Sequence, residues 1–512
     1  MNVVKFSISC SAVFALVFLP LVAIKFIQPL RCLYSIVVYL KGGLAMNKNL
    51  RNGIVVVLVG LILWFLPTPA GLKPQAWQLF SVFVATIIGF ILQPLPIGAV
   101  AFASIGITGL LGILKPAQIL TGFSTTVIWL IVSAFLFAKG FIKTGLGNRI
   151  AYTVMARIGD SSLKLAYALA ISDFIVSPAT PSNTARGGGI LYPIVKSLSL
   201  AFNSEPGPTA RKIGAYLMTS TFQVNCITSA MFITAVAPNS LVVALAAKTG
   251  NINITWGTWA LACILPGIIA LIIAPYLVYK LFPPEIKHTP EAKVIAQAEL
   301  TKMGPIKYGE KVVAGTFLLA LLMWSTGSFT KIDATVTAIV CVSVMLIFNA
   351  LEWKDVLEEK GAWDTLIWMG SLITLAGALS SVGFIGWFAK LVASSMVGYS
   401  WTTALIILWL VYMYSHYAFA SLSAHVTAMY AAFLAVAIAT GAPGFLAAMS
   451  LGVISGLMGS LTHYATGPAP IFFGSGYVSQ NDFWRIGFIM SLVNMLCFLG
   501  LGSIWWKLLG LW

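Results

Sequence analysis

The sequence predicts an all-α polytopic membrane protein, and three observations lead to that fold class. Of the 512 residues, 59% are hydrophobic and 9% are charged, whereas soluble domains carry about 25% charged residues. The apolar stretches run to roughly the 20 residues that cross a bilayer as a helix, and they are not the alternating segments of about ten residues that form an outer-membrane barrel. Sequence landmarks also recur at a nearly constant separation, which is typical of transporters built from two repeats.

The first 45 residues stand apart from the rest of the chain. Lys5 precedes the apolar run 6–23, which resembles a signal sequence or an additional membrane helix. Met46 begins a basic segment directly before a strong apolar stretch. Two interpretations of residues 1–45 stay open: an extra N-terminal hydrophobic segment, or a mis-assigned start, in which case deleting them leaves membrane insertion and activity intact.

Beyond Met46, apolar stretches alternate with short connections. The polar stretch 283–311 carries five lysines and four glutamates, and we expect it to be a cytoplasmic loop that connects a first membrane half, 46–282, to a second, 312–512. The apolar stretches expected in the membrane are 53–66, 76–93, 97–114, 124–141, 165–200, 213–247, 256–282, 312–329, 334–350, 364–380, 401–437, 444–477 and 484–506.

The chain has a formal net charge of +16, and its basic residues lie mostly in the short connections. This distribution indicates the positive-inside bias of membrane proteins and an anionic substrate. No basic groove with aromatic residues accompanies the charge, so we expect membrane lipid as a partner and no nucleic acid.

The two membrane halves share an order of landmarks. The segment 126–129 reads Thr-Val-Ile-Trp, and 365–368 reads Thr-Leu-Ile-Trp 239 residues later. A glycine and the polar segments beginning at Ser182 and Ser423 recur at separations of 238 and 241 residues. We therefore expect two repeats in the membrane.

Each half also contains segments that cannot continue as membrane helices. Residues 177–189, within the apolar region 165–200, contain two prolines and three glycines among polar side chains. Such backbone is tolerated at membrane depth only where it lines a cavity, so we expect a re-entrant hairpin, with a counterpart at 421–427. Residues 234–239 and 464–470 interrupt apolar stretches in the same way and predict one broken helix in each half.

Polar residues at these interruptions suit a carboxylate ligand. A half-helix that begins inside the membrane presents unpaired N–H groups and the positive end of its dipole. Ordinary N-capping is the alternative, but two such tips at the repeat separation favour binding. The predicted substrate-binding residues are Ser182, Asn183, Thr184, Pro238, Asn239, Ser423, Ala424, His425, Thr427, Thr466, Gly467 and Pro468.

Three motifs resemble a known family. They are Pro-Ser-Asn-Thr-Ala-Arg-Gly-Gly-Gly at 181–189, the segment 416–425, and Tyr-Ala-Thr-Gly-Pro at 464–468 followed by Gly-Ser-Gly-Tyr at 474–477. From about residue 50 onward the sequence resembles the divalent anion:sodium symporter family. Within it, the sequence is most similar to bacterial citrate/succinate and tartrate/succinate antiporters and plastid 2-oxoglutarate/malate translocators.

The resemblance implies an architecture and a function. The fold would consist of two inverted repeats with a scaffold domain and a transport domain that moves as an elevator, in a homodimer. The hairpin tips, here Ser182–Thr184 and Ser423–His425, would contact the carboxylates of a di- or tricarboxylate such as succinate, malate, 2-oxoglutarate, citrate or tartrate. A bacterial inner membrane is the expected location, ahead of a plastid inner envelope.

The sequence departs from the sodium-coupled pattern at the tips. The second tip offers Ala424 and His425, and Arg186 follows the first tip. These two basic residues can supply positive charge where a sodium-coupled relative holds a cation, which favours anion exchange without a cofactor or bound metal. Asp173, in the first arm of the first hairpin, is an expected ion-pair partner of Arg186.

Two alternatives to exchange stay open. One is sodium-coupled symport of the same anions. The other belongs to a different class, a membrane-embedded serine hydrolase that uses Ser423 and His425, although residues two apart on a helix point away from each other. The chain contains no nucleotide-binding or zinc-protease motif, so we expect that it is not an enzyme.

Overall fold

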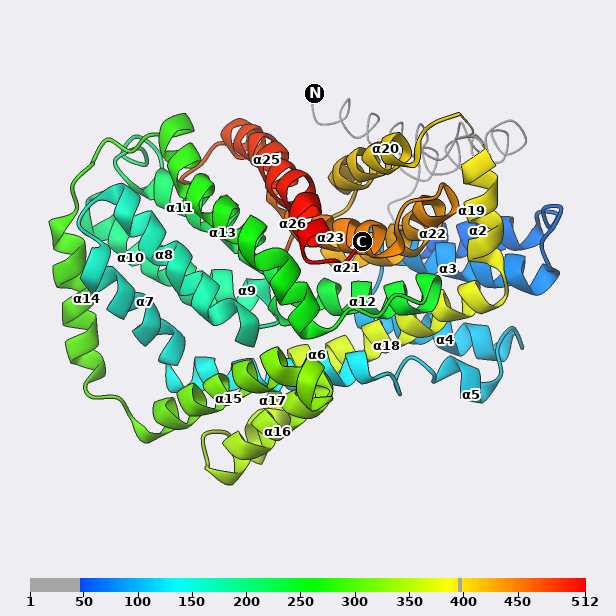
Figure 1. Cartoon of the computed structure of the whole chain (residues 1–512), viewed down its shortest axis with the longest axis horizontal. Helices are drawn as coiled ribbons and strands as arrows, with labels where there is room; N and C mark the ends of the chain where they lie inside the picture. The colour runs from blue at the N-terminus through cyan, green and yellow to red at the C-terminus, as the bar shows by residue number, and fades with distance from the viewer. Residues whose placement is uncertain (1–46, 395–397) are drawn as a thin grey trace. The chain divides into compact units, whose positions relative to one another are not determined.

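The structure is a computed structural model that describes residues 47–394 and 398–512 (Figure 1). Throughout these residues the chain forms α-, 3₁₀- and π-helices joined by turns, without a β-strand. The all-α fold class is therefore confirmed. The two interpretations of residues 1–45 lie outside the described residues.

The helices of the first part of the chain end at the polar connection. They are α2 (Lys48–Phe65), α3 (Pro74–Leu92), α4 (Ile97–Leu110), α5 (Pro116–Ile119), α6 (Thr126–Thr144), α7 (Leu146–Ile158), α8 (Ser162–Val176), η1 (Ser177–Ala179), α9 (Asn183–Arg186), η2 (Gly187–Leu191), α10 (Tyr192–Ala201), α11 (Gly214–Met231), η3 (Ile233–Ala235), α12 (Ala237–Gly250) and α13 (Trp256–Leu281).

The remaining helices run from the polar connection to the C-terminus. They are α14 (Pro290–Met303), α15 (Tyr308–Thr330), α16 (Ala334–Ile347), α17 (Trp353–Glu358), α18 (Lys360–Ser381), α19 (Phe384–Ser394), α20 (Trp401–Tyr414), η4 (Ser415–Ala418), α21 (Leu422–His425), η5 (Val426–Tyr430), α22 (Ala431–Ala439), α23 (Gly444–Leu457), η6 (Met458–Ser460), α24 (Ala469–Gly474), α25 (Gln480–Met495), η7 (Leu496–Leu501) and α26 (Gly502–Leu508).

The chain is a multi-pass membrane protein by the length and composition of its helices. Seven helical stretches in the described part of the chain are long and apolar enough to cross a membrane, and several apolar helices are shorter. The seven stretches are Pro74–Leu92, Thr126–Thr144, Ser162–Ala179, Trp256–Leu281, Lys360–Ser381, Leu422–Ala439 and Gln480–Leu508.

The polar connection 283–311 is more ordered than the expected loop, because it contains the helix α14. Pro290 occupies the first turn of α14, and Gly304, with a φ of +67°, follows its last residue. These residue types start and end helices for steric reasons. Lys164 and Lys293 donate hydrogen bonds to Asp160, which lower the pKa of that exposed carboxyl and join α14 to α8.

The described residues form two compact units, and each unit takes segments from both sequence halves. Unit 1 extends to Ile128 and adds Leu241–Asn253 and Asp364–Leu451. In it, α2 packs on α3, and α19 packs on α22. Unit 2 consists of Trp129–Ser240, Ile254–Trp363 and Gly452–Trp512. In it, α11 packs against α8 and α13 (Figure 1).

Two segments interrupt their helices where the sequence predicted re-entrant hairpins. We call α8–η1–α9–η2–α10 hairpin 1 and α20–η4–α21–η5–α22 hairpin 2. In each, an α-helix passes into a 3₁₀ turn, a short extended break, one α-helical turn and a π-helical stretch before the second arm begins. Pro178 and Pro181 interrupt hairpin 1, because proline cannot donate the helical hydrogen bond.

Candidate functional site

The tip of hairpin 1 begins with a capped half-helix. The Ser182 backbone is extended, with φ −115° and ψ 104°, and its hydroxyl accepts a hydrogen bond from the Ala185 amide at 3.1 Å. This is the N-cap geometry that serine favours. Asn183, which is buried, donates through its side-chain amide to the Thr466 hydroxyl at 2.8 Å. The predicted first tip and the predicted broken segment of the second half therefore meet within unit 2.

Gly467 allows this close approach. A Cβ atom at Gly467 would lie 1.9 Å from the hydroxyl oxygen of Thr184, far inside van der Waals contact. At Gly187, which follows α9, a Cβ atom would meet Asn225 and Pro468 at 3.2 Å. The absence of a side chain at these two glycines is what brings Thr184 and Pro468 into one cluster.

Substituting Gly467 by alanine is expected to displace Thr184. Overpacking of this kind costs about 1–3 kcal/mol, so we expect a lower Tm and about a fivefold or larger rise in the KM for a transported anion. Gly474→Ala is the matched control, because a Cβ atom there would meet nothing within 4 Å. Equal Tm and KM values for the two variants would contradict the inferred packing.

Asn239 holds the break between α11 and α12 together. Its side-chain amide donates to the carbonyls of Ser229 at 2.7 Å and Phe232 at 2.8 Å, while its own Oδ1 is buried without a hydrogen-bond partner. Pro238, also buried, lies in the first turn of α12. The N–H groups of Asn239 are therefore committed to the backbone of the broken helix, and its Oδ1, which only accepts hydrogen bonds, does not suit a carboxylate.

Arg186 forms the ion pair that the sequence predicted. Its Nε donates to Asp173 at 2.6 Å, and both side chains are fully buried. Its Nη1 donates to the backbone carbonyls of Thr180 and Ala235 at 2.9 and 3.0 Å, so the guanidinium ties the tip of hairpin 1 to the break that follows α11. The pairing of Asp173 with Arg186 is confirmed.

Polar side chains of α11 complete the surroundings of this pair. Thr228 donates to the second oxygen of Asp173 at 2.5 Å, and Asn225 donates to the same carboxylate at 3.3 Å. The Nη2 of Arg186 donates to the hydroxyls of Thr228 and Ser229. All five guanidinium N–H groups thus have protein acceptors, and Asp173 balances the charge. This arrangement does not support our expectation that Arg186 compensates the charge of a substrate, because Asp173 already neutralises the charge of Arg186.

Sequence reasoning missed the polar character of α11. The segment 219–229 reads Thr-Ser-Thr-Phe-Gln-Val-Asn-Cys-Ile-Thr-Ser, and the whole helix is buried. Buried polar atoms inside a membrane protein are costly and often functional. The density of hydroxyl and amide side chains within the apolar stretch 213–247 was the signal that could have identified them. The atoms of α11 without a hydrogen-bond partner are Ser220 Oγ, Thr221 Oγ1, Gln223 Oε1 and Asn225 Oδ1.

The tip of hairpin 2 begins two residues earlier than the sequence comparison suggested. Ser421 is the N-cap of α21, and its hydroxyl accepts from the Ala424 amide at 3.4 Å. Ser421 follows Ser182, the N-cap of hairpin 1, by 239 residues, the separation of the first landmark. The predicted equivalence of Ser182 with Ser423 is therefore wrong, because the N-cap that corresponds to Ser182 is Ser421. At the same separation of 239 residues, His425 of hairpin 2 corresponds to Arg186 of hairpin 1.

His425 is enclosed by its own hairpin in unit 1. Its Nδ1 lies 2.9 Å from the Nδ1 of His416, and its Nε2 lies 3.2 Å from the Ser415 hydroxyl. Both ring nitrogens of His425 thus have partners other than Ser423, which argues against the proposed hydrolase pair. Ser423 instead accepts, through its backbone carbonyl, a hydrogen bond from Thr427 at 2.7 Å.

The structure groups the predicted site residues into two sets. Unit 2 holds the first tip, residues 238–239 and residues 466–468, and unit 1 holds the second tip with Ala424 buried and Ser423 half-buried. Whether each of these residues contacts a substrate stays a prediction.

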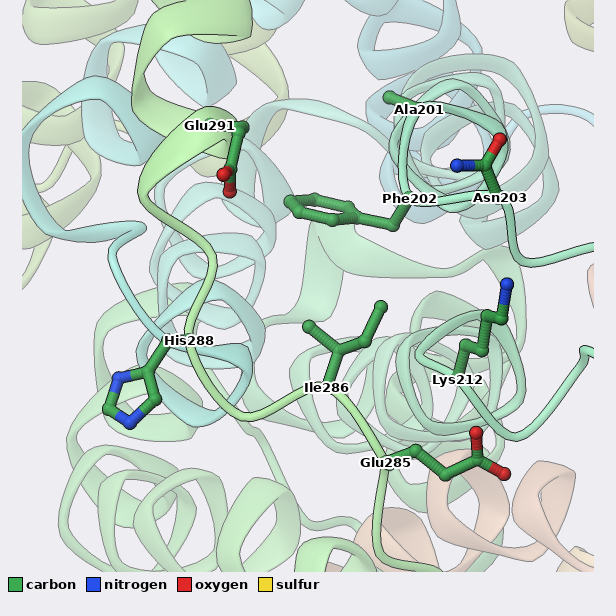
Figure 2. A pocket seen from close by; sticks show the side chains of 8 residues that line it. All are labelled: Ala201, Phe202, Asn203, Lys212, Glu285, Ile286, His288 and Glu291. Atoms are coloured by element: carbon green, nitrogen blue, oxygen red, sulfur yellow. The ribbon is translucent and has the colours of Figure 1, made fainter.

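A separate open cavity of about 540 Å³ lies beside the polar connection in unit 2. Figure 2 shows Phe202 and Ile286 across its middle, with Lys212 near Asn203 on one side. Two glutamates and one lysine are among its lining residues, so its formal charge does not suit a dianion. The full lining is Ala201, Phe202, Asn203, Lys212, Glu285, Ile286, His288 and Glu291.

Comparison with known proteins covers nearly the whole described chain. A family model for the sodium:sulfate symporter transmembrane region matches residues 47–512. The "Putative malate transporter YflS" of Bacillus subtilis is 52% identical over 460 residues, which are 90% of this chain and 96% of the relative. Dicarboxylate transporter 1, chloroplastic, of Spinacia oleracea is 47% identical, with 89% and 81% of the two chains covered.

Two further comparisons extend this result. The L-tartrate/succinate antiporter of Escherichia coli is 38% identical, with 87% of this chain and 95% of the antiporter covered. Among solved structures, the YdaH transporter of Alcanivorax borkumensis superposes with a TM-score of 0.50 over 85% of this chain and 98% of that chain. At 11% identity, that likeness shows the fold alone.

Proposed function

The chain belongs to the sodium:sulfate symporter family, also described as the divalent anion:sodium symporter family. From this premise we propose that it exchanges di- or tricarboxylates across a bacterial inner membrane. Its relatives are carboxylate transporters, so the chain is a transporter of carboxylates and not an enzyme. The exchange mode, the physiological anion and the homodimer are parts of the proposal.

The observation that supports exchange is that every N–H group of the Arg186 guanidinium has a hydrogen-bond acceptor. The carbonyl oxygens of Thr180 and Ala235, at the tip of hairpin 1 and the break after α11, are the kind of ligand that a small cation takes in transporters with broken helices. Here both accept from the guanidinium, and the Asp173 carboxylate is occupied as well. A sodium ion at this place would have to displace a buried, fully hydrogen-bonded arginine.

The tips supply the groups that suit the anion. Ser182 and Ser421 each cap a half-helix inside its hairpin, and the chain beyond each cap continues as helix for more than four turns when the π-helical stretch is included. The N-terminal ends of such helices favour carboxylates. We propose that one carboxylate of the substrate contacts the first tip near Ser182, Asn183 and Thr184, with Thr466 beside them. The second tip, near Ser421 and Ser423, offers the same kind of capped helix end to a carboxylate.

Transport in proteoliposomes tests this function. We would load vesicles with succinate, malate, 2-oxoglutarate or citrate and measure uptake of labelled anion in sodium and in potassium buffers. We expect uptake only into preloaded vesicles, at the same rate in both buffers. Uptake into empty vesicles driven by a sodium gradient would replace exchange by sodium-coupled symport. Absence of carboxylate uptake under every condition would overturn the function itself.

A further inference from the structure

Two histidines share a buried site in hairpin 2 that neither the fold nor the proposed anion contacts explain. His416 and His425 are fully buried, and their ring planes differ by 11° with centroids 5.1 Å apart. The 2.9 Å separation of their Nδ1 atoms is a hydrogen-bond distance. Since one nitrogen must donate and the other accept, a single proton lies between the two rings.

We propose that His416 and His425 together form a binding site for one additional proton, so that the charge of the tip of hairpin 2 follows pH. The consequence for transport rests on the proposed carboxylate exchange, whereas the proton site does not.

The hydrogen bonds around the pair can accept this proton without loss. Ser415 lies 3.2 Å from the Nε2 of His425 and 3.0 Å from the carbonyl of Tyr412. When Ser415 donates to that carbonyl, its oxygen can accept an N–H from His425. A protonated His425 then donates from Nδ1 to His416 and from Nε2 to Ser415, and every bond of the neutral pair is retained.

The same geometry sets the capacity of the site at one extra proton. With two extra protons, both Nδ1 atoms would carry hydrogen and face each other at 2.9 Å. The pair would then lose its hydrogen bond and bring two positive charges into contact in a buried place. The two rings therefore titrate as a coupled unit.

Aromatic faces favour the protonated form against the cost of burial. The ring of Phe419 stacks on His425 with centroids 4.5 Å apart and planes 6° apart, and the ring of Tyr412 lies 4.7 Å away. A cation stacked on such a ring face gains attraction from the ring quadrupole. Phe433 extends this aromatic shell through Tyr412.

The titratable and charged groups near the pair are few. Hairpin 2 itself contributes Tyr412, Tyr414, Tyr417 and Tyr430, of which Tyr430 donates to the Ala448 carbonyl. α3, which packs on α21 and η5, has no ionisable side chain, and α19, which packs on α22, carries the exposed Lys390. Asp364 is the only Asp or Glu among the described residues of unit 1. Among the described residues of hairpin 2 and of the helices packed on it, no carboxylate therefore sets the protonation state of the pair.

Nuclear magnetic resonance of labelled histidine in the full chain, in lipid nanodiscs, tests the site directly. The sequence contains four histidines, so His288→Gln with His463→Gln leaves only the pair. From about pH 9 down to the lowest pH at which the protein stays folded, we expect both rings to shift with one common midpoint and one proton taken up. Two independent titrations, or no uptake in this range, would overturn the proposal.

A second variant tests the arrangement without removing either ring. Ser415→Ala deletes the acceptor for the Nε2–H of protonated His425, so we expect protonation to require a pH about one unit lower. An unchanged midpoint would show that the inferred hydrogen-bond chain is wrong.

Transport measurements distinguish a failure of the proposed coupling between the proton site and transport from a failure of the proposed carboxylate exchange. In wild-type vesicles we expect the KM for succinate to rise as pH increases through the measured midpoint, because the tip loses positive charge. A KM that stays flat while the pair titrates would overturn the coupling to transport. If no exchange occurs at any pH, the proposed function fails, while the resonance titration still decides whether the pair binds a proton.

Discussion

Replacing Arg186 by methionine is expected to destabilise the protein by about 3–5 kcal/mol, the usual cost of leaving one member of a buried ion pair alone. Asp173 would keep its charge at 0% exposure with only Thr228 and Asn225 as donors. The tip of hairpin 1 would also lose its links to the carbonyls of Thr180 and Ala235. We expect a large fall in Tm, measured on detergent-solubilised protein, together with loss of exchange.

Two further variants separate the ion pair from the arginine side chain as such. Arg157→Met removes an exposed arginine of α7 and is expected to leave Tm and exchange unchanged. The double variant Asp173→Asn with Arg186→Met removes both buried charges, so part of the lost stability should return. A single variant as stable as the wild type would contradict the inferred role of the pair, and so would a double variant less stable than the single one.

The position of hairpin 1 could be predicted because its residues forbid a continuous helix. Pro178, Pro181 and the three glycines after Arg186 interrupt any regular helix, and the structure has a 3₁₀ turn, an extended break and a π-helical stretch there. The partner of Arg186 could be predicted as well, since Asp173 is the only carboxylate in the apolar region 165–200 and buried charges pair.

The register of hairpin 2 could not be obtained from residue similarity. Ser423 followed by Ala424 and His425 looked like the counterpart of Ser182, but the N-cap is decided by backbone conformation and by which hydroxyl reaches an amide three residues on. Ser421 has the extended conformation, with φ −149° and ψ 128°. A two-residue error of this kind exchanges the roles of neighbouring side chains: it placed His425 among the tip residues, whereas the structure makes His425 the counterpart of Arg186 in the other hairpin.

Other parts of the site depend on contacts between distant segments. Asn183 and Thr466 are 283 residues apart, and the space that Gly467 leaves for Thr184 becomes visible only in three dimensions. The two compact units likewise each take segments from both sequence halves, and unit 2 includes the whole polar connection 283–311. Average hydropathy also concealed the polar residues of α11, because its leucine, valine and phenylalanine residues offset its hydroxyl and amide groups.

Removing the hydroxyls of the first tip is expected to weaken anion binding about tenfold or more while leaving the protein folded. Ser182 and Thr184 are half-buried, so each can reach a ligand at the surface of the tip. Loss of a hydrogen bond to an ionised group costs about 1–3 kcal/mol. The double variant Ser182→Ala with Thr184→Val should therefore raise the KM for succinate in counterflow, with expression close to wild type and Tm lowered only by loss of the α9 cap.

Ser182 has two roles, and a second substitution separates them. Its hydroxyl caps α9 through the Ala185 amide, and alanine at an N-cap costs about 0.5–2 kcal/mol, whereas glycine costs only a few tenths. If the hydroxyl binds the anion, Ser182→Gly and Ser182→Ala should raise the KM equally; if it only caps the helix, glycine should restore the wild-type KM. Ser172→Ala is the matched control, because Ser172 donates only to the Ala168 carbonyl within α8 and should have no effect on KM. Near-native exchange by the double variant would remove the hydroxyls of Ser182 and Thr184 from the anion site, and the anion would then have to be held by other donors, such as Asn183, Thr466 and the unpartnered hydroxyls of α11.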